Sequence, residues 1–138
     1  MKKLFLIYLI SFFSNCYAQN LEIFELRKRC SLEADRYIQF HGHEILSPSK
    51  DVIHTITNHY NKNNGRCLLR IQYTTIGAKD DKVISVYDVI ENRKVSTFIS
   101  GIHDKFKKYW VFLCTLSDGS KCISEQEFEH DAQKLMSE

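Results

Sequence analysis

The chain has 138 residues, and its 19 Lys and Arg residues exceed its 17 Asp and Glu residues by the two lysines at positions 2 and 3. This length suits one domain with one core, and a single proline, five glycines and no low-complexity tract give no indication of a linker or a second domain. Beyond those two lysines the chain carries no net charge, which argues against a general electrostatic affinity for nucleic acid.

The first 18 residues match the three parts of an export signal. Lys2 and Lys3 form a basic start, residues 4–13 an apolar run, and a short polar exit ends at Ala18. We expect cleavage after Ala18, which leaves residues 19–138 as a periplasmic or secreted protein. The apolar run has half of the ~20 residues that a membrane-spanning helix needs, so we expect no transmembrane anchor. Acylation of Cys16 is the alternative, but the residue before it, Asn, is not the small one that lipoprotein signals show.

Two N-terminal helices are predicted. Between Leu21 and Ile38, apolar residues that include Cys30 recur at three- and four-residue steps, which is typical of an amphipathic helix. We interpret residues 41–44 (His-Gly-His-Glu) as its exit loop. A second helix is predicted over residues 49–60, with a proline at its entrance. The alternative for this segment is a strand, because it is rich in β-branched residues.

From residue 67 the apolar period changes from 3.6 to 2, which predicts strands. On the last of them we expect Trp110, Phe112 and Cys114 to share one face. Polar turns separate the strands, and this order is typical of an antiparallel meander. The predicted strands cover residues 67–74, 83–90, 95–102 and 109–116.

The sequence Ser-Glu-Gln-Glu at residues 124–127 is a capping-box pattern and predicts a helix that ends near Met136. The predicted fold class is therefore α+β. It comprises two N-terminal helices, an antiparallel sheet of four to five strands and a C-terminal helix, with the helices covering one face of the sheet.

Four cysteines remain beyond the signal, and an even number in an exported chain predicts two disulfides. A three-residue loop at residues 117–119, with its glycine in the left-handed conformation, would place Cys114 opposite Cys122. Cys30 would then bind Cys67 and join the first helix to the first strand of the meander. Cysteines held in disulfides are not available for thiol catalysis.

His41, His43 and Glu44 are weak candidates for a metal site, because imidazole suits zinc or copper and alternate residues of an extended loop point the same way. A metal site usually draws its ligands from several segments, whereas these three belong to one. We therefore expect no resident metal and no other cofactor.

A small hydrolase or metal-dependent enzyme is the alternative function. No nucleophile-elbow, zinc-protease or cysteine-protease signature selects any residue for catalysis, and carboxylates that flank a turn are usually solvated. We therefore assign no catalytic residue and expect no catalytic activity. The residues with suitable chemistry are His41, His43, Asp88, Glu91 and His103, with Ser100 and Asp104.

Residues 105–110 interleave lysines with aromatic residues, a combination that is common in interaction hot spots. The expected function is an exported binding module, and the expected partner is a protein or another component of the bacterial envelope rather than nucleic acid. An inhibitor or an immunity protein is one subtype that suits this size and compartment. The predicted interaction residues are Lys105, Lys107, Lys108, Tyr109 and Trp110.

The chain resembles a loose group of small exported bacterial proteins of unassigned function. The resemblance implies export and a shared scaffold, and it implies no catalytic residue. It covers residues 59–130 and is carried by residues 59–61 (His-Tyr-Asn) before Cys67, by residues 87–89 (Tyr-Asp-Val) with Glu91 and Lys94, and by Cys114, Cys122, Ser124 and Phe128.

Overall fold

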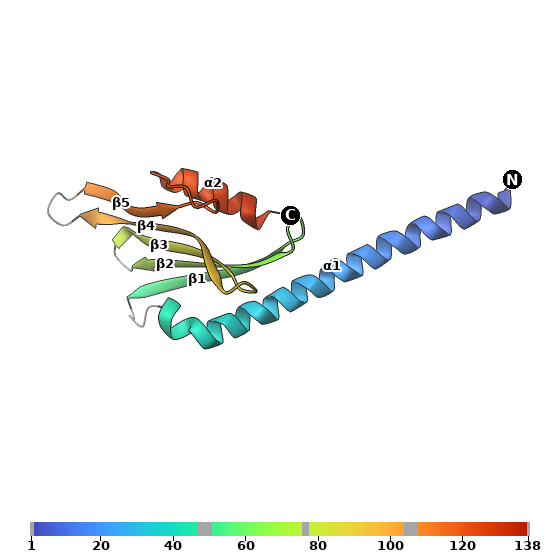
Figure 1. Cartoon of the computed structure of the whole chain (residues 1–138), viewed down its shortest axis with the longest axis horizontal. Helices are drawn as coiled ribbons and strands as arrows, with labels where there is room; N and C mark the ends of the chain where they lie inside the picture. Colours follow the sequence, from blue (N-terminus) through green and yellow to red (C-terminus); the bar gives the residue numbers. More distant parts are fainter. Residues whose placement is uncertain (1, 47–50, 76–77, 104–107, 138) are drawn as a thin grey trace.

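The computed structural model describes the backbone of residues 2–46, 51–75, 78–103 and 108–137, and the side chains of residues 20–46, 51–75, 81–102 and 108–137. Within these residues, helices α1 (Lys2–Ile45) and α2 (Glu125–Met136) flank one sheet (Figure 1). The strands are β1 (Val52–Asn61), β2 (Arg66–Thr75), β3 (Ala78–Asp88), β4 (Arg93–His103) and β5 (Lys108–Thr115).

The five strands form one antiparallel sheet in chain order, β1-β2-β3-β4-β5. The predicted meander is confirmed, and β1 adds a strand at its start. Because β1 and β5 each have one neighbouring strand in this order, they are the two edges of the sheet. The α+β class, the C-terminal helix and the two disulfides are confirmed as well.

The prediction of a second helix over residues 49–60 is wrong, because Val52–Asn61 forms β1. The strand pairs with β2 over its whole length, from Val52 opposite Thr75 to Asn61 opposite Arg66. The β-branched residues of this segment fit the pleated surface of a sheet. Pairing with β2 also gives the backbone N–H and C=O groups of the segment hydrogen-bond partners, whereas a short isolated helix is only marginally stable. Two N-terminal helices are thus replaced by one long helix and one strand.

The exit loop predicted at residues 41–44 is also wrong, because α1 continues to Ile45. The N–H of Leu46 still donates to the carbonyl of Gly42 at 2.8 Å. A glycine inside a helix costs about 1 kcal/mol relative to alanine. Packing of Ile38, Ile45 and Leu46 on the sheet offsets this cost.

The N-terminal half of α1 extends beyond the strands, whereas its C-terminal half lies along the sheet beside β1 and β2 (Figure 1). The predicted signal peptide belongs to the extending half, and its cleavage after Ala18 stays a prediction. Within the described residues, no helix combines the length and the apolar character that crossing a membrane requires.

The helices cover opposite faces of the sheet, so the prediction that they share one face is wrong. Leu69 and Ile71 of β2 form a core cluster with Ala34 of α1. The neighbouring Leu68 belongs instead to a cluster with Phe128 of α2. Because successive side chains of a strand point to opposite faces, α1 and α2 lie on either side of the sheet.

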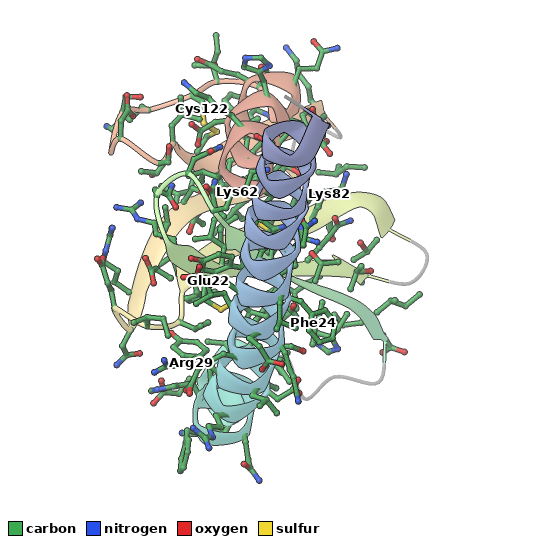
Figure 2. All side chains as sticks on the ribbon, turned by 90° about the vertical axis from the view of Figure 1, so that its right-hand side faces the viewer. Glu22, Phe24, Arg29, Lys62, Lys82 and Cys122 are labelled. Atoms are coloured by element: carbon green, nitrogen blue, oxygen red, sulfur yellow. A yellow bond between two sulfur atoms is a disulfide. The ribbon has the colours of Figure 1, made fainter. Side chains whose placement is uncertain are left out.

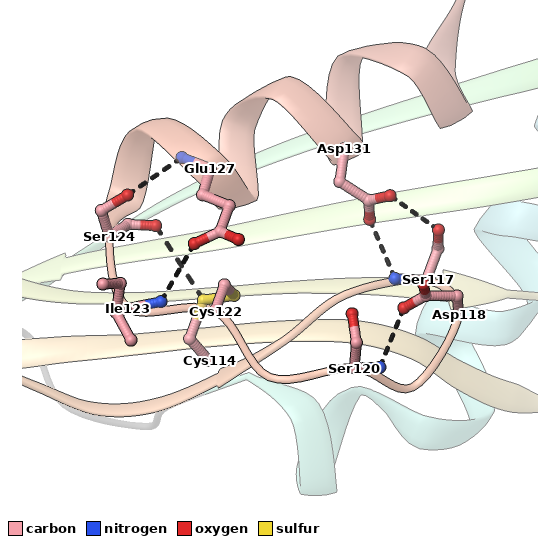
Figure 3. Close-up of a disulfide and its surroundings, with 9 residues drawn as sticks. All are labelled: Cys114, Ser117, Asp118, Ser120, Cys122, Ile123, Ser124, Glu127 and Asp131. Atoms are coloured by element: carbon pink, nitrogen blue, oxygen red, sulfur yellow. Dashed lines mark hydrogen bonds between the residues drawn. A yellow bond between two sulfur atoms is a disulfide. The ribbon is translucent and has the colours of Figure 1, made fainter.

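Both predicted disulfide pairings are confirmed. Cys30 and Cys67, with Cα atoms 5.3 Å apart, join α1 to β2. Cys114 and Cys122, with Cα atoms 5.0 Å apart, close the loop that follows β5 (Figure 3). Two cross-links therefore hold the helical layer and the last hairpin to the sheet.

The loop inside the second disulfide has the predicted geometry. The N–H of Leu116 donates to the carbonyl of Ser120 at 2.8 Å, and Gly119 has a φ of +86°. A φ in this region favours glycine because other residues place their Cβ against the backbone there. The three-residue loop thus sets the register that brings the two sulfurs together.

The helix start predicted at Ser124 is confirmed, although the return bond from Glu127 reaches the residue before the cap (Figure 3). The Ser124 hydroxyl accepts the N–H of Glu127 at 3.2 Å, and the Glu127 carboxylate accepts the N–H of Ile123 at 3.2 Å. Farther along the helix, the Asp131 carboxylate accepts both the N–H and the hydroxyl of Ser117, at 2.9 and 2.8 Å. These bonds attach both ends of the loop after β5 to α2.

Asn61 joins the β1–β2 turn to the end of α2, and its loss should destabilise the fold. It is 3 % exposed, its amide donates to the Leu135 carbonyl at 2.6 Å, and its side-chain oxygen accepts the N–H groups of Asn63 and Asn64. We expect Asn61→Ala to lower the free energy of unfolding by about 1–3 kcal/mol, because three part-buried hydrogen bonds to backbone groups and the packing of a buried side chain are lost. Urea unfolding measures this loss. The exposed Asn58→Ala on the same strand should change it by less than about 0.5 kcal/mol, and equal losses would contradict the assignment.

His59 of β1 should make stability depend on pH. Burial, and secondarily Arg27 of α1, lower the pKa of His59 below its usual 6.5. The unfolded chain then binds this proton more readily than the folded protein, so stability should fall as the pH drops below about 6.5. Urea unfolding near pH 7.5 and 5.5 should show a smaller difference in His59→Gln than in the wild type. The exposed His130→Gln should retain the full difference, and a His59→Gln variant that also retains it would contradict this account.

Candidate interaction surface

The edge strand β5 exposes large apolar side chains. Tyr109, Trp110, Phe112 and Leu113 are 43, 45, 56 and 46 % exposed, and Ile123, which follows the second disulfide, is 86 % exposed. A contiguous apolar patch on a soluble protein commonly marks a site of interaction. We define the β5 surface as Lys108, Tyr109, Trp110, Phe112, Leu113 and Ile123.

The interaction residues predicted from the sequence overlap with this surface. Lys108, Tyr109 and Trp110 lie at the start of β5 and are exposed. Lys105 and Lys107 lie outside the described residues. Sequence reasoning missed the rest of the surface, because an unbroken apolar run is typical of a strand that is buried on both faces.

A β-bulge in β5 explains why the predicted common face of Trp110, Phe112 and Cys114 is wrong. Cys114 pairs with Phe98, whereas Trp110 pairs with Gly101, so β5 uses four steps where β4 uses three. The extra residue reverses the alternation of side chains. Cys114 therefore lies in the core beneath α2, and Trp110 lies on the opposite face.

Gly101 makes room for the aromatic side chains of β5. A Cβ atom at this position would lie 3.1 Å from Cε2 of Phe112 and 2.7 Å from Oδ1 of Asp81. The Phe112 ring therefore lies over Gly101 of β4. A larger residue in place of this glycine would crowd the ring. This arrangement places Phe112 beside Trp110, on the part of the face that lies away from β1 and β2.

An open groove of about 490 Å³ runs along the outer edge of β5. Strand residues 108–114 line it on one side and residues 121–123 on the other. Among the described residues that line it, Lys108 and Lys121 are the charged ones. The groove thus combines exposed aromatic side chains with positive charge.

The weak metal candidates lie in the last turns of α1. His41 Nδ1 is 3.7 Å and His43 Nε2 is 3.5 Å from the two carboxylate oxygens of Glu44. His43 and Glu44 are largely exposed. Among the residues whose side chains are described, no three His, Cys, Asp or Glu side chains are grouped as a metal site requires.

Asp88 and Glu91 build the β3–β4 turn. Asp88 is buried, contrary to the expectation of a solvated carboxylate, and its Oδ1 accepts the N–H groups of Ile90 and Glu91 at 3.2 Å each. Glu91 is exposed and accepts the Nε–H of Arg93 at 2.5 Å, and this hydrogen bond lowers the pKa of Glu91. Both carboxylates thus have structural partners within the turn.

The other residues considered for catalysis do not lie in the β3–β4 turn. Ser100 is buried in β4. The side chains of His103 and Asp104 lie outside the described residues. The residues proposed for a hydrolase are therefore distributed between the last turns of α1, the β3–β4 turn and the interior of β4.

A second hollow, of about 450 Å³, lies where the end of α1 meets the sheet, and His43 and Glu44 border it. On its sheet side, Asp81 accepts the N–H of Ile102 at 3.3 Å, and Lys82 bonds Glu125 at 2.5 Å. Burial and the nearby Tyr87 raise the pKa of Tyr73, which also borders the hollow, to about 12. Its phenol therefore stays protonated at neutral pH and supplies no general base. The remaining lining residues are Ile45, Leu46, Val52, Thr75, Val83 and Ser100.

Comparison of the chain with models of protein families, with curated proteins and with solved structures finds no match. Function has therefore to be inferred from the geometry of the chain's own residues. The β5 surface is the feature that offers most to a partner, since it joins exposed aromatic area, an open strand edge and positive charge.

Proposed function

We propose that this protein is an exported binding module of a bacterial envelope, or a secreted one, and that it binds another protein through the β5 surface. The observation that supports this most strongly is the exposure of Trp110, Phe112 and Leu113 on an edge strand. Aromatic side chains near the centre of an interface, with a cation beside them, supply much of the affinity of protein complexes.

The export part of the proposal rests on the signal-like residues 1–18 and on the two disulfides. Disulfides persist in oxidising compartments such as the periplasm and the extracellular medium. An inhibitor or an immunity protein fits a small scaffold whose surface is fixed by two cross-links.

The shape of the groove favours a protein over a small molecule. Sites for small molecules enclose most of their ligand, whereas this groove is open along a strand. The equal numbers of acidic and basic residues beyond Lys3 give no general attraction for nucleic acid. A protein partner can cover the exposed strand and its side chains together.

Affinity capture tests the proposal. Mature protein, residues 19–138, is immobilised and exposed to envelope extract of the producing bacterium. We expect the double variant Phe112→Ser/Leu113→Ser to recover the partner at least about tenfold less well, since each truncated hot spot can cost more than 1 kcal/mol.

The matched control is Leu21→Ser/Phe24→Ser on α1, whose side chains are 56 and 61 % exposed. Figure 2 labels Phe24 on this helix. It should recover the partner as well as the wild type does. Melting curves of both variants should match the wild type, which excludes unfolding as a cause. Equal recovery by the β5 variant and the wild type would refute the proposed surface.

A further inference from the structure

We infer, building on the proposed function, that the partner presents an extended acidic segment, and that this segment adds to the sheet as a further strand along β5. The backbone of β5, the residues that follow it in the chain and the charges at the groove support this binding mode.

β5 is an edge strand, so one side of its backbone faces away from β4. Among the described residues, backbone groups meet this edge only near its end, where the Cys122 N–H donates to the Cys114 carbonyl at 3.2 Å and Lys121 forms a bridge with Thr115. Unpaired N–H and C=O groups of an edge strand are a template for another strand. Among the described residues of β5, Lys108, Tyr109 and residues 111–113 supply this template.

The chain's own residues show that the edge accepts an extended segment. Residues 121–123 run beside the end of β5 and begin the pairing just described. The pairing stops there because Ser124 caps α2 and turns the chain away. A segment of the partner that enters the groove continues the same pairing along residues 108–113.

The charges at the groove indicate an acidic segment. Lys108 and Lys121 lie towards opposite ends of the lining, and they are the charged side chains among the described residues that line the groove. Opposite charges directly across a strand pair stabilise it, whereas like charges destabilise it. A segment with Glu or Asp at its ends and apolar residues between them complements both the lysines and the aromatic side chains.

The other edge of the sheet is less suited to this role. β1 exposes Ile53 and Ile56, but it also carries the polar residues Thr55, Thr57 and Asn58 along that stretch, and α1 packs close to it. The combination of exposed aromatic side chains and positive charge is therefore found on β5. The same charges disfavour a second copy of the chain as the occupant, because pairing of β5 with itself would bring two sets of lysines together.

Synthetic peptides test the inference with the mature protein. The chain has a single tryptophan, Trp110, so its fluorescence reports binding at β5. The probes are eight-residue peptides, the length of β5, in which valine alternates with glutamate or with lysine. We expect the glutamate peptide to bind at least about tenfold more tightly than the lysine peptide, a difference of about 1.4 kcal/mol.

N-methylated peptides separate strand addition from simple apolar contact. Methylation of alternate amides removes the donors on one edge of the peptide and leaves its side chains unchanged. One of the two possible methylation patterns should weaken binding of the glutamate peptide at least about tenfold, because several backbone hydrogen bonds are lost. Equal binding by unmethylated peptides and by both methylated ones would overturn strand addition.

Charge reversal supplies a second test. The variant Lys108→Glu/Lys121→Glu should prefer the lysine peptide, while the control Lys28→Glu/Lys62→Glu, at two exposed positions away from β5, should keep the preference for glutamate. Unchanged preference in the first variant would refute the acidic segment.

The outcome also distinguishes the inference from the proposed function. If no peptide changes the fluorescence of Trp110, yet Phe112→Ser/Leu113→Ser abolishes capture of the partner, strand addition is wrong and binding through the β5 surface stands. If both experiments fail, both are wrong. A dimer of the mature protein that the same variant dissociates in sedimentation would identify a second copy as the occupant and overturn the inference.

Discussion

Replacing Cys30 and Cys67 together by alanine should lower the free energy of unfolding by about 4 kcal/mol. The two residues are 37 positions apart in the chain, so their cross-link removes much of the conformational freedom of the unfolded state. Both are 2 % exposed and lie where α1 meets β2. Typical domains are stable by about 5–15 kcal/mol, so this loss should leave the fold marginal.

The second disulfide provides the matched control. Cys114 and Cys122 are eight positions apart, and on the same entropic argument their replacement by alanine should cost about 2.5 kcal/mol. Urea unfolding of the two double variants measures both losses. A smaller loss for the Cys30 and Cys67 pair than for the other pair would contradict the view that this bond holds the helical layer.

Phe128→Ala should lower the free energy of unfolding by about 3–5 kcal/mol, the usual cost of a truncated core phenylalanine. Phe128 is fully buried on the inner side of α2, and its ring centroid lies 5.6 Å from that of Phe98 in β4. The variant would leave a cavity between α2 and the sheet. The ion pairs Arg70–Glu129 and Lys82–Glu125 also join α2 to the sheet, but they are partly exposed and therefore add too little stability to offset this loss.

Phe40→Ala is the control for this prediction, because Phe40 is 71 % exposed on α1. It should change the free energy of unfolding by less than about 0.5 kcal/mol. Thermal and urea unfolding of both variants give the comparison. If Phe128→Ala cost no more than Phe40→Ala, α2 would not pack on the sheet as described.

Local signals in the sequence predicted the second half of the fold well. The Ser124 cap of α2 and the glycine of the loop at residues 117–119 depend on neighbours within a few positions, and both have the expected geometry. The disulfide pairing followed from that loop, because its length fixes which residues of the hairpin face each other. Such features need no knowledge of distant contacts.

The first half of the fold depends on contacts between residues far apart in the chain, and there two predictions from the sequence are wrong. Residues 49–60 have an apolar pattern that suits a helix or a strand, and pairing with β2 decides between them. Gly42 signals a loop, but packing of the neighbouring apolar residues on the sheet keeps it helical. In both places tertiary contacts outweigh local propensity.

The candidate site was predicted in part. The lysine and aromatic residues at positions 108–110 indicated an interaction surface, and they lie exposed on β5. The bulge that turns Trp110 away from Cys114 leaves no mark in the sequence, because it follows from how β5 pairs with β4. Strand order, which makes β5 an edge, likewise became known only from the sheet.

Amide hydrogen exchange of the mature protein with and without its captured partner tests the central claim, binding through the β5 surface, most directly. We predict that exchange at residues 108–113 slows at least about tenfold in the complex, because these amides become covered, while residues 53–58 of the other edge strand keep their rates. Slower exchange confined to α1 or β1, with β5 unchanged, would contradict the account.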